Sequence, residues 1–343
     1  MVRSLEPPIP DAVRREAAEL FKPALATLAR NVPASDDWFC EVKFDGYRML
    51  ADSDAGHPVL RSRNGLDWTA RLPEIAAAVA WIPDREAVVD GEVVAFRPDG
   101  ISSFELMKAA LSGGQTDRLV YMVFDLLALD GWDLRPCRQD DRSDVLERLL
   151  VEHGSDRVRL SERRHDVAAA AHRAACTRGL EGIMLKRRDA RYRPGRSDAW
   201  LKVKCGSRQE LVVVGFTEPE GARCGFGALL LGYHDPAGRL VYAGRVGTGF
   251  STAFLLSFRP KLDAIARAEP AVDPPRSYPL PGVHWVDPHY VAEIRFSEWT
   301  RDGILRHPSF VGLREDKKAA EVVREVPGVP PAGAEGARQT RQA

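Results

Sequence analysis

Short β-like runs separated by turn-rich pieces recur along this chain, and this pattern limits its fold more than any other feature. Helical periodicity fits best over 71–80, 102–111, 139–151 and 166–177. Strands and helices therefore mix without a strict strand–helix–strand rhythm, which predicts an α+β fold rather than a doubly wound sheet. The β-like runs of the first half are WFCEV (38–42), YRMLA (47–51), PVLRS (58–62), AVVDGEVVAF (87–96), read as two strands or one bent strand, and LVYMVFDLLAL (119–129).

The stretch up to about Arg30 has a different pattern from the β-like runs that follow it. Apolar residues recur there at roughly helical spacing, which predicts a short N-terminal helical segment. The residues that carry this pattern are Ala12, Val13, Ala17, Ala18, Leu20 and Phe21.

A second change of pattern falls near Cys205. Beyond it, strands with glycine-bearing turns are expected at 210–216, 228–235, 240–250, 290–298 and 303–311, with a helix at 251–265. Five short strands with one helix between the third and the fourth are typical of an OB-fold barrel. We therefore expect domains at 1–205 and 206–325. Residues 326–343 are rich in Pro, Gly, Ala and Gln and are expected to be disordered.

Charge is balanced overall but unevenly distributed. The chain has 49 Lys and Arg against 49 Asp and Glu, yet residues 157–208 hold 15 basic residues against 5 acidic ones. A basic block is most often a solvated face, but this one surrounds the motifs described below. Because phosphate contacts are local, we expect this block to face phosphates.

The five cysteines form no CxxC pair and are odd in number. This argues against a disulfide framework and a zinc site, and fits a reducing cytosol. The N-terminus has no apolar signal region, and no run of 18 apolar residues could span a membrane. We therefore expect a cytoplasmic protein.

Lys43 is the candidate nucleophile, in the segment Glu41-Val-Lys-Phe-Asp-Gly-Tyr-Arg48. A lysine amine attacks only after it loses its proton, and burial with neighbouring cations would lower its pKa. A solvated lysine is the alternative, because K-x-D-G alone is a weak signal.

Further charged segments follow Lys43 in order. They are Ser62-Arg63-Asn64-Gly65, Asp90-Gly-Glu92-Val, Val123-Phe124-Asp125-Leu126, Glu181-Gly-Ile-Met-Leu-Lys186, Trp200-Leu-Lys202-Val-Lys204 and Arg314-Glu-Asp316-Lys317. This series resembles that of the covalent nucleotidyltransferases, the superfamily of DNA ligases, RNA ligases and mRNA capping enzymes. The segments 298–303 and 305–317 are similar to the bacterial end-joining DNA ligases, ligase D and its stand-alone relatives.

The resemblance covers about residues 21–318 and implies an adenylation domain of antiparallel sheets and helices, followed by an OB-fold. It also implies ATP as the nucleotide and Mg²⁺ or Mn²⁺ as the metal. In the family's scheme AMP is carried on Lys43, and Glu92 and Glu181 hold the metal. The other residues expected to bind the nucleotide are Glu41, Arg48, Arg63, Glu92, Phe124, Lys202, Lys204, Arg314, Asp316 and Lys317.

Residue chemistry agrees with these roles. Lys202 and Lys204 alternate along a predicted strand, so both point to one face and can reach an α-phosphate. An unpaired buried Glu92 would be costly, and a metal or a ribose hydroxyl would relieve that cost, although an edge charge facing water is the alternative. Phe124 would stack on adenine, and ordinary core packing is equally common for such a residue.

The same resemblance implies nicked double-stranded DNA as the substrate of a monomeric minimal ligase core. The NMN-binding and zinc modules of NAD-dependent ligases are absent from the sequence, as are the polymerase and phosphoesterase modules of full-length ligase D. The Ku homodimer and an end-joining polymerase are candidate partners that the residues do not decide. An RNA ligase or capping guanylyltransferase is the enzymatic alternative, and a non-catalytic DNA-binding module is the other.

Overall fold

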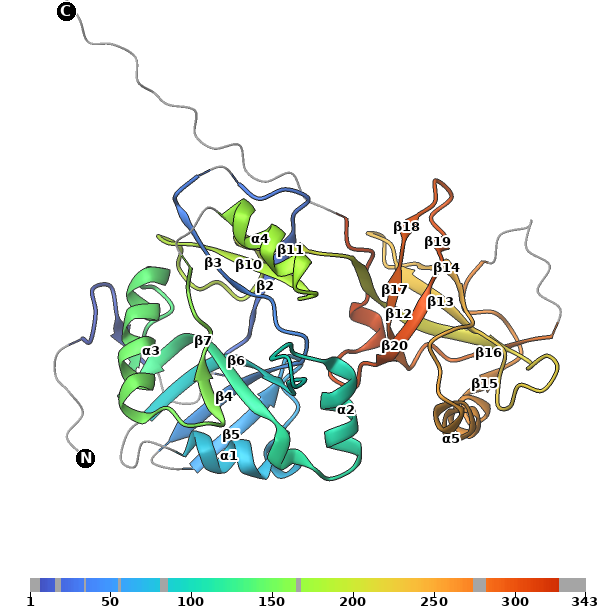
Figure 1. Cartoon of the computed structure of the whole chain (residues 1–343), viewed down its shortest axis with the longest axis horizontal. Coiled ribbons are helices and arrows are strands. Elements are labelled where there is room, and N and C mark those ends of the chain that lie inside the picture. Colours follow the sequence, from blue (N-terminus) through green and yellow to red (C-terminus); the bar gives the residue numbers. More distant parts are fainter. Residues whose placement is uncertain are drawn as a thin grey trace, which may run out of the picture. The chain divides into compact units, whose positions relative to one another are not determined.

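The computed structural model describes residues 7–15, 20–33, 35–54, 57–80, 86–164, 168–273 and 282–326 (Figure 1). The chain divides between Cys205 and Gly206 into two compact units, called here the N-terminal unit and the C-terminal unit. No helix of the described residues is long and apolar enough to cross a membrane. The expected disordered tail lies, beyond residue 326, outside the described residues.

The N-terminal unit contains two sheets. The large sheet has the order β1-β8-β7-β6-β4-β5, with β9 parallel to β7, and the small sheet has the order β2-β11-β10-β3. The large sheet is formed by Val13–Arg14 (β1), Tyr47–Asp54 (β4), His57–Ser62 (β5), Glu86–Val94 (β6), Val120–Leu129 (β7), Trp132–Asp133 (β8) and Val158–Leu160 (β9). The small sheet is formed by Ala24–Leu28 (β2), Trp38–Val42 (β3), Gly182–Arg187 (β10) and Gly195–Lys204 (β11).

One hydrophobic cluster joins the two sheets. Leu50 and Val88 come from the large sheet, and Ala24 and Trp200 come from the small one. All four are at most 4% exposed, so the inward faces of the sheets pack against each other. Of the two alternatives for 87–96, the bent strand is found, because β6 continues through a register shift between Asp90 and Gly91.

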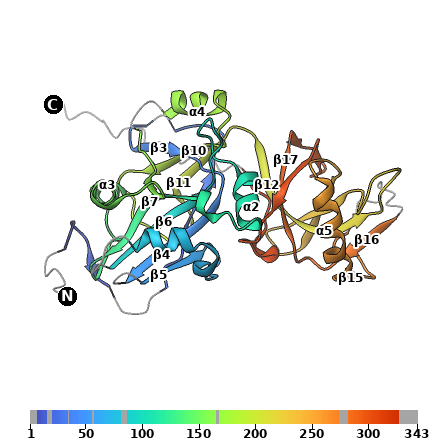
Figure 2. The same cartoon turned by 60° about the horizontal axis from the view of Figure 1, so that its bottom comes forward.

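Helices cover the outer faces of these sheets, close to the predicted ranges (Figure 2). Ser103 caps α2 by accepting a hydrogen bond from the Leu106 N–H. Helix α4 contributes Ala175 to a cluster on the outer face of the small sheet. The helices are Pro73–Val79 (α1), Phe104–Ser112 (α2), Gln139–His153 (α3) and Ala168–Thr177 (α4), with 3₁₀ turns at Thr69–Arg71 (η1) and Thr116–Arg118 (η2).

The predicted N-terminal helix is wrong where the structure describes it. Val13–Arg14 pairs with β8, and Ala24–Leu28 pairs in parallel with β11. Pro23 disfavours helical backbone at the residue before it, and strand pairing supplies the hydrogen bonds that a helix would have made. Residues 16–19, which carry part of the helical pattern, lie outside the described residues.

The C-terminal unit has the strand pairing of an OB-fold. Along the chain, helix α5 falls between the third of the barrel strands, β14, and the fourth, β17. The strands pair in the order β14-β13-β12-β17-β20. The Phe310 N–H donates to the Thr248 carbonyl at 2.9 Å, which joins the two ends of this order. The elements are Ser207–Thr217 (β12), Leu229–His234 (β13), Leu240–Val246 (β14), Thr252–Asp263 (α5), Val291–Phe296 (β17) and Ser309–Leu313 (β20).

Smaller elements complete this unit, and one of them corrects a prediction. The single strand expected at 303–311 is two strands, because His307 takes a positive φ of 50° and Pro308 has no N–H to donate. The added elements are Ala266–Arg267 (β15), Val283–Val286 (β16), Glu298–Trp299 (β18), Leu305–Arg306 (β19) and the 3₁₀ turn Ala319–Glu321 (η3).

Cysteine pairing also differs from the expectation. Cys176 and Cys205 form a disulfide, whereas the sequence argued against a disulfide framework. The odd number of cysteines and the missing CxxC motif did not predict this bond, because helix α4 and the end of β11 bring together two cysteines separated by 29 positions. Cys40, Cys137 and Cys224 are free.

Candidate active site

Lys43 lies directly after β3, at the end of the small sheet. Its backbone N–H donates to the Gly182 carbonyl at 3.0 Å, which continues the pairing of β3 with β10 for one residue. The chain then turns at Gly46, where an added Cβ would lie 2.2 Å from the Val93 carbonyl oxygen. Only glycine allows this approach to β6, so the K-x-D-G sequence fixes the place of the lysine between the two sheets.

The amine of Lys43 is held by a carboxylate. Its Nζ lies 2.7 Å from Glu181 Oε2, and the two side chains are 18% and 8% exposed. Burial lowers the pKa of Lys43, but Glu181, assisted by Glu92 and opposed by Lys204, more than offsets it, so the pKa is raised. We expected the surroundings to lower this pKa, and that expectation is wrong, because the nearest charge is the Glu181 carboxylate rather than a cation.

Register within the small sheet gathers several predicted residues on one face. Lys202 pairs with Met184, which pairs with Glu41, so these side chains share a face with Lys204 two positions further on. Opposite Lys204 stands Gly182, at φ 151°, where a Cβ would lie 2.2 Å from the Val203 carbonyl. Four charged side chains, Glu41, Lys186, Lys202 and Lys204, therefore lie on this face, called here the polar face, beside the apolar Met184 and Trp200. The opposite face packs on α4.

Glu41 and Lys186 form a buried ion pair on the same polar face. Lys186 Nζ lies 2.7 Å from Glu41 Oε1 and 2.8 Å from the Phe124 carbonyl, and the Ser161 hydroxyl donates to Glu41 Oε2 at 2.8 Å. Sequence reasoning quoted Lys186 in a motif but gave it no role. No local signal indicated the contact with Glu41, because it depends on the pairing of β10 with β3.

Arg48 is held by one carboxylate of the large sheet, that of Asp90. Asp90 accepts from Arg48 Nε at 2.8 Å and from its Nη2 at 2.5 Å, and Tyr192 donates to the same carboxylate at 2.7 Å. Glu92 pairs with Arg48 across β6 and β4, and its charge acts on both Arg48 and Lys43. The Glu92 carboxylate therefore lies close enough to both side chains for its charge to act on them.

Phe124 has a half-buried ring at the junction of the sheets. Trp200 meets it edge-on, with ring centroids 5.9 Å apart, and Lys186 Nζ and the Arg48 guanidinium lie 4.6 and 5.1 Å from its centroid. The residue packs against the shared core and also borders the charged residues. Core packing by Phe124 is thus compatible with the expected stacking of its ring on adenine.

Asp125, Gln139 and Arg142, called here the sealed layer, are fully buried, Asp125 directly after Phe124 in the sequence and the other two in α3. Asp125 and Arg142 are fully buried and form a two-pronged pair at 2.8 and 2.9 Å, to which Gln139 adds a hydrogen bond. Gln139 also accepts from the indole N–H of Trp200 at 2.9 Å. This network fixes the strand and the tryptophan on which the site is built.

The remaining predicted residues lie in two other places. Arg63 is in the turn after β5, the strand that pairs with β4. Arg314, Asp316 and Lys317 belong to the C-terminal unit. There Asp316, 0% exposed, binds Arg314 twice at 2.8 Å, and Lys317 Nζ lies 2.6 Å from Glu210.

Glu92 and Glu181 fit a divalent cation chemically. Both are half-buried, and both carboxylates act on the Lys43 amine, so their charges share one neighbourhood. Oxygen ligands suit Mg²⁺ and Mn²⁺, and Mg²⁺ commonly takes one or two protein carboxylates beside water and phosphate oxygens.

Two sheets with a half-buried lysine between them, followed by an OB-fold, place the chain in the class of covalent nucleotidyltransferases. A family model described as "ATP dependent DNA ligase domain" matches residues 18–204, and "ATP dependent DNA ligase C terminal region" matches 222–317. The chain belongs to the ATP-dependent DNA ligase family.

Individual relatives agree with this assignment. "Multifunctional non-homologous end joining protein LigD" of Pseudomonas aeruginosa is 40% identical over 91% of this chain, and the Mycobacterium bovis protein of that name is 41% identical over 85%. The chain spans 38% of the length of each. The solved structure of mycobacterial DNA ligase D complexed with ATP and MES matches with TM-score 0.65 and 38% identity, covering 89% of this chain and 98% of that one.

Proposed function

We propose that this protein seals nicks between a 5′-phosphate and a 3′-hydroxyl in double-stranded DNA, using an AMP carried on Lys43. The observation that carries the proposal is the Lys43 amine, half-buried at the end of a polar sheet face and held 2.7 Å from Glu181. A relative at 38% identity is a ligase solved with ATP, which supports ATP as the nucleotide.

The first step joins Lys43 to the nucleotide. The neutral Nζ attacks the α-phosphorus of ATP, an N–P bond forms, and the P–O bond to pyrophosphate breaks. Because Glu181 favours the protonated amine, this carboxylate must be drawn away or accept the proton before attack. A divalent metal on Glu92 and Glu181 would supply charge neutralisation for the phosphates.

Other residues of the N-terminal unit hold the substrate. Lys202 and Lys204, on the same face as Glu41, would bind the α-phosphate, and such fixed cations stabilise charge that develops in the transition state. Phe124 would stack on adenine, Glu41 would contact its edge, and Arg48 and Arg63 would hold the ribose and nearby oxygens. Asp90 keeps the Arg48 guanidinium in one orientation.

The later steps use DNA. The 5′-phosphate oxygen attacks the adenylate phosphorus and releases Lys43, and the 3′-hydroxyl then attacks the activated 5′-phosphate and releases AMP. Arg314, Asp316 and Lys317 would serve the first step on the β- and γ-phosphates, and the C-terminal unit would then reorient toward the nick.

The setting of this activity is proposed from its relatives. Two of them are named for non-homologous end joining, so we propose a role in repair of DNA breaks in the bacterial cytosol, as a monomer. Ku and an end-joining polymerase are the proposed partners. The basic block at 157–208 suits binding to the phosphate backbone, and DNA affinity should fall steeply with salt.

Mass spectrometry of the protein treated with ATP tests the proposal directly. We expect an adenylate on the peptide that contains Lys43, and no adenylate or nick sealing with Lys43→Ala. Lys261→Ala, an exposed lysine on α5, is the matched control and should behave as wild type. Sealing by Lys43→Ala at the wild-type rate, or labelling from GTP but not ATP, would refute the proposal.

A further inference from the structure

The Cys176–Cys205 pair lies on the face of the small sheet that packs on α4, opposite the polar face, where the chain leaves the N-terminal unit. Cys176 is near the end of α4, and Cys205 is the last residue of the unit. Their Cα atoms are 5.1 Å apart, within the range that a disulfide spans without backbone movement. Both residues are half-buried, so small thiols and disulfides can reach them.

The crosslink closes a chain segment that carries much of the active site. Glu181, Lys186, Lys202 and Lys204 all lie between the two cysteines in sequence. The Cys205 N–H also donates to the Glu181 carbonyl at 3.0 Å, and Gly182 pairs with Lys204. The disulfide therefore fastens the residue after Lys204 to the helix that precedes Glu181.

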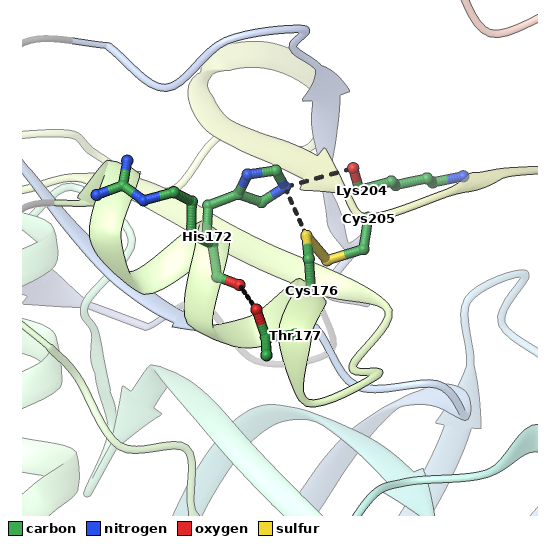
Figure 3. Close-up of a disulfide and its surroundings, with 6 residues drawn as sticks. His172, Cys176, Thr177, Lys204 and Cys205 are labelled. Atoms are coloured by element: carbon green, nitrogen blue, oxygen red, sulfur yellow. Dashed lines mark hydrogen bonds between the residues drawn. A yellow bond between two sulfur atoms is a disulfide. The ribbon is translucent and has the colours of Figure 1, made fainter.

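An imidazole accompanies the sulfurs. His172, one turn before Cys176 on α4, has its Nε2 3.4 Å from Cys176 Sγ and 3.4 Å from the Lys204 carbonyl oxygen (Figure 3). The Lys204 side chain points away from the sulfurs, toward its own face of the strand. Exchange between thiols and disulfides proceeds through the thiolate, and a neighbouring imidazole is suited to take the thiol proton.

We propose that Cys176 and Cys205 form a reversible thiol–disulfide site whose oxidation restrains the chain at the boundary between the two units. Cys205 is covalently tied on one side and continues into Gly206 on the other, so the crosslink removes backbone freedom where the C-terminal unit begins. The consequence for catalysis rests on the proposed function, in which the C-terminal unit must reorient between steps.

A small disulfide such as oxidised glutathione is the oxidant. One cysteine thiolate attacks it, forms a mixed disulfide and releases one glutathione thiol. The second cysteine then attacks the mixed disulfide, forms the S–S bond and releases the second glutathione. Two electrons pass from the protein sulfurs to the glutathione sulfurs, and both cysteine protons end on the released thiols.

The first test detects the bond in the full-length chain. The protein is equilibrated with mixtures of reduced and oxidised glutathione, quenched with acid and alkylated, and its peptides are mapped by mass spectrometry. We expect a linked 176–205 peptide that appears and disappears reversibly, while Cys224 stays alkylated. Absence of the link at every ratio would overturn the proposal, and so would one equivalent of Zn²⁺ held by His172 and two unreactive thiols.

The second test measures the restraint without using catalysis. Hydrogen exchange in peptides that span residues 199–212 should be about threefold or more slower in the oxidised protein. Cys176→Ser should exchange equally in both buffers, and Cys224→Ser, in the C-terminal unit, should respond as wild type. Equal exchange in oxidised and reduced wild type would overturn the restraint.

Single-turnover sealing then connects the restraint to function. Oxidised wild type should seal nicks several-fold more slowly than reduced wild type, whereas Cys176→Ser should seal at the reduced wild-type rate in both buffers. Equal sealing rates would overturn the catalytic consequence. If reduced protein never forms the Lys43 adenylate, the proposed function fails, and the peptide map and exchange rates still decide the disulfide proposal.

Discussion

Each unit contains a cluster of charged side chains, and the two clusters differ in their balance of cations and carboxylates. In the N-terminal unit, Lys43, Lys186 and Arg48 each have one carboxylate partner, while Lys202 and Lys204 add positive charge on the same face. In the C-terminal unit, two cations face three carboxylates. Arg314 contacts Asp316 and Glu293, and Lys317 contacts Glu210.

This difference indicates what each cluster is prepared to do. The first gathers five cations with the carboxylates of Glu41, Asp90, Glu92 and Glu181, and its Lys202 and Lys204 lie on the face where we propose that a polyphosphate binds. The second must give up contacts with its own acids before its cations bind phosphate, so its carboxylates fix the geometry of Arg314 and Lys317 beforehand. The raised pKa of Arg314, which burial opposes and Asp316 more than restores, agrees with such tight pairing.

The sealed layer of the N-terminal unit gives the largest expected effect on stability. Asp125→Asn leaves the fully buried Arg142 without its anionic partner and should lower the free energy of unfolding by about 3 kcal/mol. Burial opposes ionisation, but Arg142 holds the pKa of Asp125 below its ordinary value of 3.8. The pair's contribution is thus present above that pH and lost as pH falls through the lowered pKa.

Urea unfolding followed by tryptophan fluorescence measures this change. The control is Glu298→Gln in the C-terminal unit, whose pair with Arg306 at 2.9 Å is exposed on both sides. It should change stability by no more than about 0.5 kcal/mol. Equal losses in the two variants would remove the distinction between the sealed layer and the surface.

The rate of self-adenylation should distinguish the two charge clusters when one carboxylate of each is changed, and Glu181→Gln makes this change in the first. It removes the negative charge beside Lys43 and one oxygen of the proposed metal site, and self-adenylation should fall by about 10²- to 10³-fold. Glu210→Gln makes the same change to a carboxylate 2.6 Å from Lys317 and should alter the rate by only a few-fold. Single-turnover labelling with ATP measures both rates. Similar losses in the two variants would contradict the proposal that Glu181 acts at the reacting amine while Glu210 only contacts Lys317.

Asp316→Ala tests whether the C-terminal cluster serves only the first step. It frees the Arg314 guanidinium from its two-pronged contact, and self-adenylation should fall by roughly 10- to 100-fold. Sealing of nicks that are already adenylated should survive. Arg306→Ala, an exposed cation of the same unit, is the control. Equal loss of both steps would exclude the role assigned to this cluster.

The smallest predicted effect is on the titration of Lys43 itself. Because Glu181 raises its pKa, the amine should react with an acylating reagent only at higher pH than an ordinary lysine. In Glu181→Gln, burial and Lys204 act without that opposition, and the labelling curve should move to lower pH. Competitive labelling with peptide mass spectrometry measures the shift. An unchanged curve would show that the Lys43–Glu181 contact is not an ion pair in solution.

Local sequence determined much of the outline. β-like runs bounded by turn residues predicted β3, β4, β7 and most of the barrel strands, and helical periodicity predicted α1–α4, because these patterns depend on near neighbours. The order of the charged segments indicated the family. Helical periodicity gave a wrong prediction at the N-terminus, where strand pairing with residues more than 100 positions away decided the structure.

Only the tertiary structure decided the partners of the charged residues. That Lys43 meets Glu181, that Lys186 meets Glu41, and that Cys176 meets Cys205 depends on sheet register and on the packing of α4. The sequence by itself supplied a lysine beside a glycine turn and an ordered set of acids and bases. The sign of the Lys43 pKa shift followed from which of them came nearest, because charge interactions depend on distances in space rather than on spacing along the chain.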